Sequence, residues 1–181
     1  MKKKTLVTAL ALVLVVCCAV GGVLAWLTDK TEAVVNTFTV GDINITLAET
    51  PKEYKMVPGN DIAKDPTVTV EANSEACWLF VKVEKSANFD TFMTCAIADD
   101  WTQLPGVDGV YYRQVAATTA DVEYAVLADN QVSVKDNVTK TMLNGLTEKT
   151  QPTLTFTAYA VQKDNVASAA DAWAIANPVA P

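Results

Sequence analysis

Hydrophobic and polar residues alternate with a period of two over several short stretches, a pattern that predicts β-strands with one buried and one wet face. At 43–47 isoleucine and leucine alternate with Asn44 and Thr46, and at 67–71 valines alternate with threonines. Gly, Asp, Asn or Pro turn formers bound the other candidate strands. These strands are predicted at 110–115, 122–127, 131–134 and 153–161.

Residues 77–84 form a more continuous apolar run, which is typical of a central strand covered on both faces. The odd-numbered side chains, from Cys77 to Val83, are expected to face one way. The even-numbered ones are expected to face the other way, and they are Trp78, Phe80, Lys82 and Glu84.

Two stretches break the strand rhythm and predict helical excursions. In 88–100, apolar residues recur at spacings of three and four, which fits a short amphipathic helix or a capping excursion. The alanine-rich stretch 167–176 follows Asn165 and precedes Pro178, so it predicts one or two helical turns. With many short strands around them, these features predict a mainly β protein, an antiparallel β-sandwich with short helical excursions.

The first residues resemble an export signal. Lysines at 2–4 precede 23 uncharged positions from Thr5 to Leu27, and small residues at Val23 and Ala25 lead into a polar segment. This pattern predicts an apolar signal helix that is cut between Ala25 and Trp26. An uncleaved membrane anchor is the alternative, because about 20 apolar residues can span a bilayer. We therefore expect a signal peptide at 1–25, a single β-sandwich domain at 26–181, and contact with the membrane only in the precursor.

The charge is strongly acidic after this cut. All 21 acidic residues lie beyond the signal, where 11 basic residues remain, which gives a net charge of −10. Arg113 is the single arginine, and no basic run occurs outside 2–4. Phosphate binding needs clustered Lys and Arg, so the sequence argues against nucleic acid as a partner. An acidic surface is typical of a soluble exported protein.

Several motifs, taken in order, are similar to the TasA/camelysin family of Gram-positive bacteria. They are Leu24-Ala25-Trp26-Leu27-Thr28-Asp29, Asn36-Thr37-Phe38-Thr39-Val40-Gly41, Val57-Pro58-Gly59-Asn60, Trp78-Leu79-Phe80-Val81-Lys82-Val83, Val110-Tyr111-Tyr112 and Ala158-Tyr159-Ala160-Val161-Gln162, with a later Ala172-Trp173. The resemblance implies a jelly-roll form of the sandwich and cleavage by a SipW-type signal peptidase. It also implies a relation to secreted subunits of biofilm-matrix fibres.

Catalytic chemistry has little support in the residues. The camelysin branch has been described as metallopeptidase, but this chain contains no histidine. A zinc hydrolase and a Ser-His-Asp or Cys-His nucleophile are therefore not expected. We expect no catalytic residue, no cofactor and no metal. Calcium is the alternative, with Asp99, Asp100 and Asp108, or Asp61 with Asp65, as candidate oxygen ligands.

The mature chain would keep two cysteines, Cys77 and Cys95. Outside the cell such a pair can form one disulfide. Alternatively, Cys77 packs as a small apolar residue within its hydrophobic run. For the tryptophans, we expect core positions for Trp78 and Trp173 and leave Trp101 open between core and surface.

These observations favour a secreted structural protein of the extracellular matrix or cell surface, a fibre subunit or an accessory protein. The expected assembly strand has apolar side chains that can pair with the edge of its own sheet or of a neighbouring subunit. Its residues are Phe38, Val40, Ile43, Ile45 and Leu47. The expected partners are a SipW-type signal peptidase and further copies of the chain or a related fibre subunit. A monomeric cell-surface binding module is the second interpretation, and a camelysin-type hydrolase the third.

Overall fold

A computed structural model describes residues 42–50 and 55–177 of the chain. Within these ranges the protein is mainly β, with antiparallel sheets and a few short helices. No helix among the described residues has the length and apolar character needed to cross a membrane. The predicted signal segment, with Val23, Ala25 and Trp26, lies outside the described residues, as do Phe38 and Val40.

A four-stranded sheet organises the fold, with strand order β10-β4-β7-β6. Its strands are β4 (Cys77–Lys85), β6 (Thr102–Gln103), β7 (Val110–Val115) and β10 (Leu154–Gln162). The predicted central strand at 77–84 is confirmed, because β4 pairs with β10 on one side and with β7 on the other.

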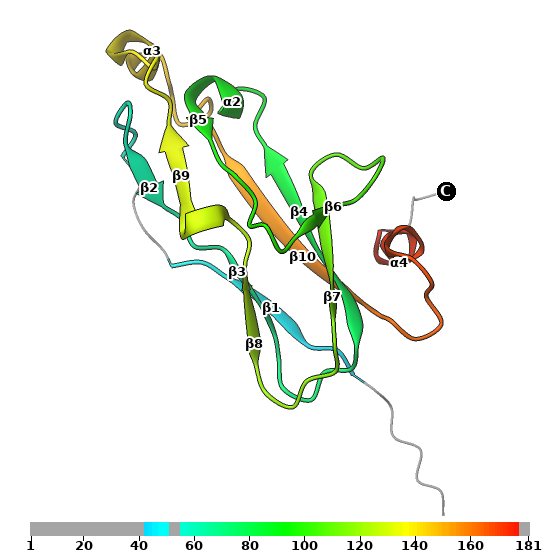
Figure 1. The fold of residues 1–181 in the computed structure, drawn as a ribbon. Coiled ribbons are helices and arrows are strands. Elements are labelled where there is room, and N and C mark those ends of the chain that lie inside the picture. The colour runs from blue at the N-terminus through cyan, green and yellow to red at the C-terminus, as the bar shows by residue number, and fades with distance from the viewer. Residues whose placement is uncertain (1–41, 51–54, 178–181) are drawn as a thin grey trace, which may run out of the picture. The chain divides into compact units, whose positions relative to one another are not determined.

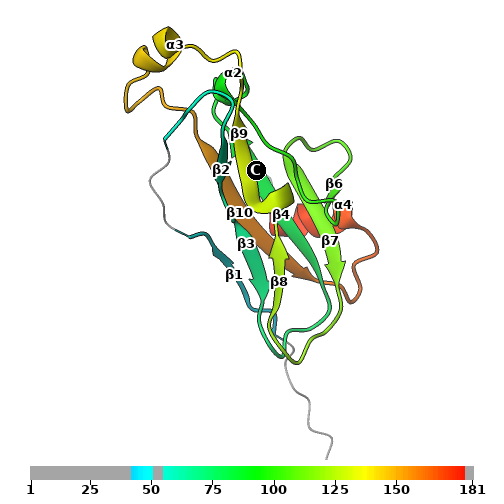
Figure 2. The same cartoon turned by 60° about the vertical axis from the view of Figure 1, so that its left-hand side comes forward.

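Two three-stranded sheets accompany the four-stranded sheet. One has the order β1-β3-β8 and consists of β1 (Ile45–Ala48), β3 (Thr67–Val70) and β8 (Val122–Ala125). The other has the order β2-β9-β5 and consists of β2 (Asp61–Ala63), β5 (Met93–Thr94) and β9 (Gln131–Val134). A 3-10 turn, η1 (Ala128–Asn130), lies between β8 and β9 in the chain. Figure 2 shows that β9 runs on in nearly the same direction as β8.

Side chains of β4 are buried on both faces, as the continuous apolar run predicts. The odd-numbered residues, including Leu79 and Val81, join a core cluster with Val68 and Val70 of β3. The even-numbered Trp78 and Phe80 join a second cluster. In that cluster they pack against α4 (Ala169–Ala176), which Figure 1 shows on the side of the sheet away from β1, β3 and β8.

The carboxy-terminal helix confirms the helical turns expected in 167–176. Ser168 caps it: its Oγ accepts a hydrogen bond from the Asp171 backbone N–H at 3.1 Å and lies 2.6 Å from Asp171 Oδ2. Trp173 is the anchor of this helix, with its ring 5.4 Å from that of Phe80 and 5.2 Å from that of Tyr159. Trp78 and Trp173 are therefore core residues, as predicted.

Of the stretch 88–100, in which a short helix or capping excursion is expected, only the start is helical. The structure has a single helical turn, α2 (Phe89–Phe92), after which Met93–Thr94 becomes β5 and pairs with β9. Ile97 then forms a β-bridge with Leu127. Backbone pairing with β9 thus overrides the apolar spacing, although Phe89, Phe92 and Met93 are buried all the same.

A further helix, α3 (Lys140–Asn144), was not predicted from the sequence. Thr139 begins it, because its hydroxyl accepts a hydrogen bond from the Met142 N–H at 3.3 Å. Gly145 follows its last residue. A threonine cap followed by a later glycine is a local signal that could have located this helix.

Candidate assembly groove

Among the predicted assembly residues, Ile43, Ile45 and Leu47 are described by the structure. Ile43 and Ile45 pack against the first core cluster, as expected for one buried face. Leu47 departs from the expectation, because it is 37% exposed. The reason is its place at the rim: β1 pairs with β3 alone among the described strands, and Leu47 lies where the sheet ends.

Two of the sheet edges in the described part of the chain, those of β1 and β10, lie close to each other. β1 forms the edge of the β1-β3-β8 sheet, and β10 forms the edge of the four-stranded sheet. Ile45 of β1 and Phe156 and Ala158 of β10 pack against the same core cluster, and both cartoon views place the two strands side by side. Along these edges the backbone pairs with no further strand in 42–50 or 55–177, and such edge groups are hydrogen-bonding sites that another extended segment could occupy.

A cavity of about 310 Å³ lies between these edges. We call it the edge groove. Its walls come from both strands and from the start of β3, and it is lined by Leu47, Ala48, Glu49, Pro66, Leu154, Thr155 and Phe156. Apolar side chains on both walls and free edges beside them make this groove a fitting receptor for a strand with alternating apolar residues.

An ion pair involves Glu49, one of the residues that line the edge groove. Lys64 Nζ lies 2.7 Å and 2.9 Å from the two carboxylate oxygens of Glu49, and it also lies 5.6 Å from the ring centroid of Phe156. Glu49 follows β1 and Lys64 follows β2, so the pair connects two sheets. Because both side chains are partly shielded from water, the pair neutralises the charge at this point.

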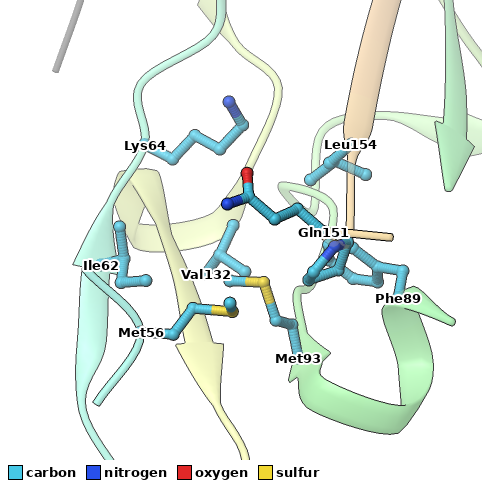
Figure 3. Close-up of a pocket in the computed structure, with 9 residues that line it drawn as sticks. Met56, Ile62, Lys64, Phe89, Met93, Val132, Gln151 and Leu154 are labelled. Carbon is cyan, nitrogen blue, oxygen red and sulfur yellow. The ribbon is translucent and has the colours of Figure 1, made fainter. Parts of the chain in front are cut away.

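A second pocket of about 300 Å³ lies next to the ion pair. We call it the methionine pocket. Figure 3 shows that its walls come from β2, β9, β5, α2 and the start of β10. It is lined by Met56, Ile62, Lys64, Phe89, Met93, Val132, Gln151, Pro152 and Leu154. No sequence pattern predicts this pocket, since its residues come from segments up to about a hundred positions apart and share no motif.

The sequence allowed either a disulfide between Cys77 and Cys95 or two free thiols. In the structure both cysteines are free thiols. Cys77 begins β4, whereas Cys95 lines a cavity beside Val83 and Lys85 near the other end of that strand. Six residues of extended strand span roughly 20 Å, and a disulfide needs Cα atoms within about 7 Å. Cys77 instead packs as a small apolar residue in the first core cluster, as the alternative interpretation expects.

Burial also controls the chemistry of both thiols. It raises the pKa of Cys77 to about 11. Burial raises the pKa of Cys95 as well, and the nearby Lys85 charge opposes that rise. Neither thiol is therefore an activated nucleophile, which would need a lowered pKa.

Three of the five candidate calcium ligands have local partners instead. Asp61 accepts a hydrogen bond from Ser133 Oγ at 2.6 Å, Asp65 accepts one from Thr50 Oγ1 at 2.6 Å, and Asp100 pairs with Arg113. No group of three or more His, Cys, Asp or Glu side chains that could hold a metal ion occurs among residues 42–50 and 55–177. The calcium alternative thus gains no support from the described residues.

Trp101, for which the sequence allowed either a core or a surface position, is buried. Its ring joins the first core cluster, and its indole N–H donates a hydrogen bond to the Ala125 carbonyl at 2.8 Å. The three tryptophans in the described part of the chain are therefore packing residues and form no exposed platform for sugars.

Comparison with known proteins adds no relative: no protein family, curated protein or solved structure matches this chain. The similarity to the TasA/camelysin family accordingly remains an interpretation of the quoted motifs. Any function has to be argued from the site itself.

Proposed function

We propose that this chain is an exported structural protein of the extracellular matrix or cell surface, a fibre subunit or accessory protein related to the TasA/camelysin family. In this proposal its sheets form a jelly-roll sandwich, and residues 1–25 are a signal peptide removed by a SipW-type peptidase. In this proposal the chain is not an enzyme, and the absence of histidine, the usual zinc ligand and general base, supports that part of it.

The edge groove is the observation that carries this proposal. It is apolar on both walls and lies between two edges, β1 and β10, that lack a strand partner among the described residues. Edges of this kind are commonly blocked by charge, proline or a covering loop in proteins that stay monomeric. Here the β1 edge exposes Leu47, an apolar side chain that a second chain would cover.

The segment just before the described residues has the pattern that such a groove would accept. In Asn36-Thr37-Phe38-Thr39-Val40, Phe38 and Val40 are two residues apart, so in an extended strand they share one face. We propose that this strand of one copy pairs with the edge of the next copy, with these two side chains in the edge groove. Contact between two different surfaces propagates as a filament wherever the rotation between successive copies does not close a ring.

Electron microscopy of the chain recovered from culture fluid, with mass spectrometry of its first residue, tests the proposal. We expect filaments and a first residue of Trp26. Deleting residues 26–35 is expected to spare the fold and reduce filament length, because it removes the segment that precedes the proposed pairing strand. A chain that begins at Met1 and sediments as a monomer at all concentrations would contradict the proposal.

A further inference from the structure

The methionine pocket has the size of a site for one ring system. Its volume is about 300 Å³, at the lower end of the range for small-molecule sites. For scale, an apolar cavity of roughly 150 Å³ admits benzene. A ring with one substituent fits this space, whereas the acyl chain of a lipid exceeds it.

Two thioethers form a large part of its lining. Figure 3 shows the sulfur atoms of Met56 and Met93 at the ends of side chains that extend into the pocket from different elements. Sulfur makes favourable contacts with aromatic rings, and methionine adapts its shape to what it contacts. Phe89, at the far wall, is buried and adds an aromatic surface. These walls favour an aromatic guest over an aliphatic one.

The polar groups of the pocket select against charge. Lys64 is the charged residue of the lining, and Glu49 already neutralises it through two short contacts. An anion would have to displace that carboxylate, and a cation would meet Lys64. Gln151 extends its amide into the pocket, as Figure 3 shows, and that amide makes no side-chain hydrogen bond to a residue that the structure describes. It can donate one hydrogen bond and accept another.

We propose that the methionine pocket is a binding site for small neutral aromatic molecules that carry one O–H or N–H group. The ring lies between Met56, Met93 and Phe89, and the polar group reaches Gln151. The site lies next to the edge groove: Leu154 lines both, and Lys64 of the methionine pocket pairs with Glu49 of the edge groove.

Phenol, cyclohexanol and benzoate form a matched set of probes for the full-length chain. Phenol and cyclohexanol are similar in size and share one hydroxyl but differ in the ring, while benzoate keeps the ring and adds a charge. The methionine methyl groups, labelled with carbon-13, report the site by NMR. Phenol should shift the Met56 and Met93 signals upfield, while Met142, which lies outside the pocket lining, stays in place. Phenol should bind about three- to tenfold more tightly than cyclohexanol, as expected from sulfur–ring contacts.

Variants locate the binding. Ile62→Trp fills the pocket from the edge strand β2 and should abolish the phenol shifts, whereas Leu47→Trp, in the edge groove, should preserve them. If Ile62→Trp does not fold, Gln151→Ala gives the decisive result, because its exposed side chain can be removed without disturbing the core and phenol should then bind more weakly. Equal shifts at Met56, Met93 and Met142, equal affinities for phenol and cyclohexanol, tighter binding of benzoate, or unchanged binding in a folded pocket variant would overturn the proposal.

Discussion

The guanidinium carbon of Arg113 lies 3.8 Å from the ring centroid of Tyr124, so a residue of β7 stacks on a residue of β8 in a different sheet. The same guanidinium lies 5.5 Å from the ring centroid of Trp101 and pairs with Asp100. The single arginine of the chain thus connects the four-stranded sheet to the β1-β3-β8 sheet at the wall of the first core cluster.

We predict that Arg113→Lys destabilises the fold by about 1–2 kcal/mol, because a lysine ammonium lacks the planar surface that stacks on Tyr124. Urea denaturation measures the change. Asp100→Asn is the control: the carboxylate is 55% exposed, so its loss should cost less than about 1 kcal/mol. An equal loss in the two variants would show that the ion pair, and not the stacking, matters at this position.

The docking of α4 depends on Trp173. Truncation to alanine removes a buried ring that contacts both Phe80 and Tyr159, and we predict a loss of about 3–5 kcal/mol in the free energy of unfolding. Ile175→Ala on the same helix serves as the control, since its side chain is 60% exposed and should change stability by about 0.5 kcal/mol or less. Thermal unfolding followed by tryptophan fluorescence compares Ile175→Ala with the parent, and circular dichroism compares all three.

Two glycines with positive φ provide a matched pair. Gly106 and Gly109 have φ values of 78° and 70°, but a Cβ at Gly109 would lie 2.6 Å from the Val83 carbonyl oxygen, whereas one at Gly106 meets no atom within 4 Å. We predict that Gly106→Ala costs about 1 kcal/mol from the backbone conformation alone. Gly109→Ala should cost clearly more, because it also disturbs the 2.7 Å hydrogen bond from the Val83 N–H to the Gly109 carbonyl. Chemical denaturation that ranks the two variants in the opposite order would contradict this account.

The Cys77 thiol makes stability depend on pH in the alkaline range. Burial raises its pKa from the ordinary value of 9.0 to about 11, so the unfolded chain releases this proton first as the pH rises. The stabilisation is therefore complete below about pH 9 and is lost progressively toward pH 11. Denaturation at a series of pH values should show a steeper decline above pH 9 in the parent than in Cys77→Ala, after correction for the lower stability of the variant. If stability declined equally steeply with pH in the parent and in Cys77→Ala, the Cys77 thiol would not be the cause of the decline.

Many of the strands could be predicted from residue patterns, because the face that a strand buries is visible in the residues of that strand alone. The alternation in β3 and the two-sided run in β4 reflect burial that each strand carries in its own sequence. The pattern failed at 88–100, where spacing suited a helix but pairing with β9 made a strand of Met93–Thr94. Such pairing depends on a segment some forty residues later, which no local window contains.

The site was predictable only in part for a related reason. Leu47 follows the alternation of Ile43 and Ile45, yet it lies at a sheet edge, and an edge position has no signature within the strand. The methionine pocket combines Met56, Met93 and Gln151 from three distant segments. Its existence depends on how two sheets end beside each other, which is a property of the assembled structure.

The last prediction concerns Leu47 and tests whether the edge groove mediates assembly. Leu47→Lys places a charge on one wall of the groove, opposite Leu154 and Phe156. The fold should tolerate the change, because Leu47 is already 37% exposed on an edge strand, where lysine is common. A neighbouring strand that inserts apolar side chains would instead have to bury that charge, at a cost of several kcal/mol. Electron microscopy and sedimentation should therefore show shorter or absent filaments with an unchanged unfolding midpoint.

Two further variants make the result specific. Val57→Lys is the matched control, because Val57 is 47% exposed but lines neither the edge groove nor the methionine pocket, and its filaments should equal those of the parent. Ile45→Lys should lower stability itself, since Ile45 packs against the first core cluster and pairs with Val70 inside its own subunit. If Leu47→Lys and Val57→Lys assemble to the same extent, a surface other than the edge groove joins the subunits. Loss of assembly in Leu47→Lys alone, with stability retained, would locate the contact between subunits at the β1 and β10 edges.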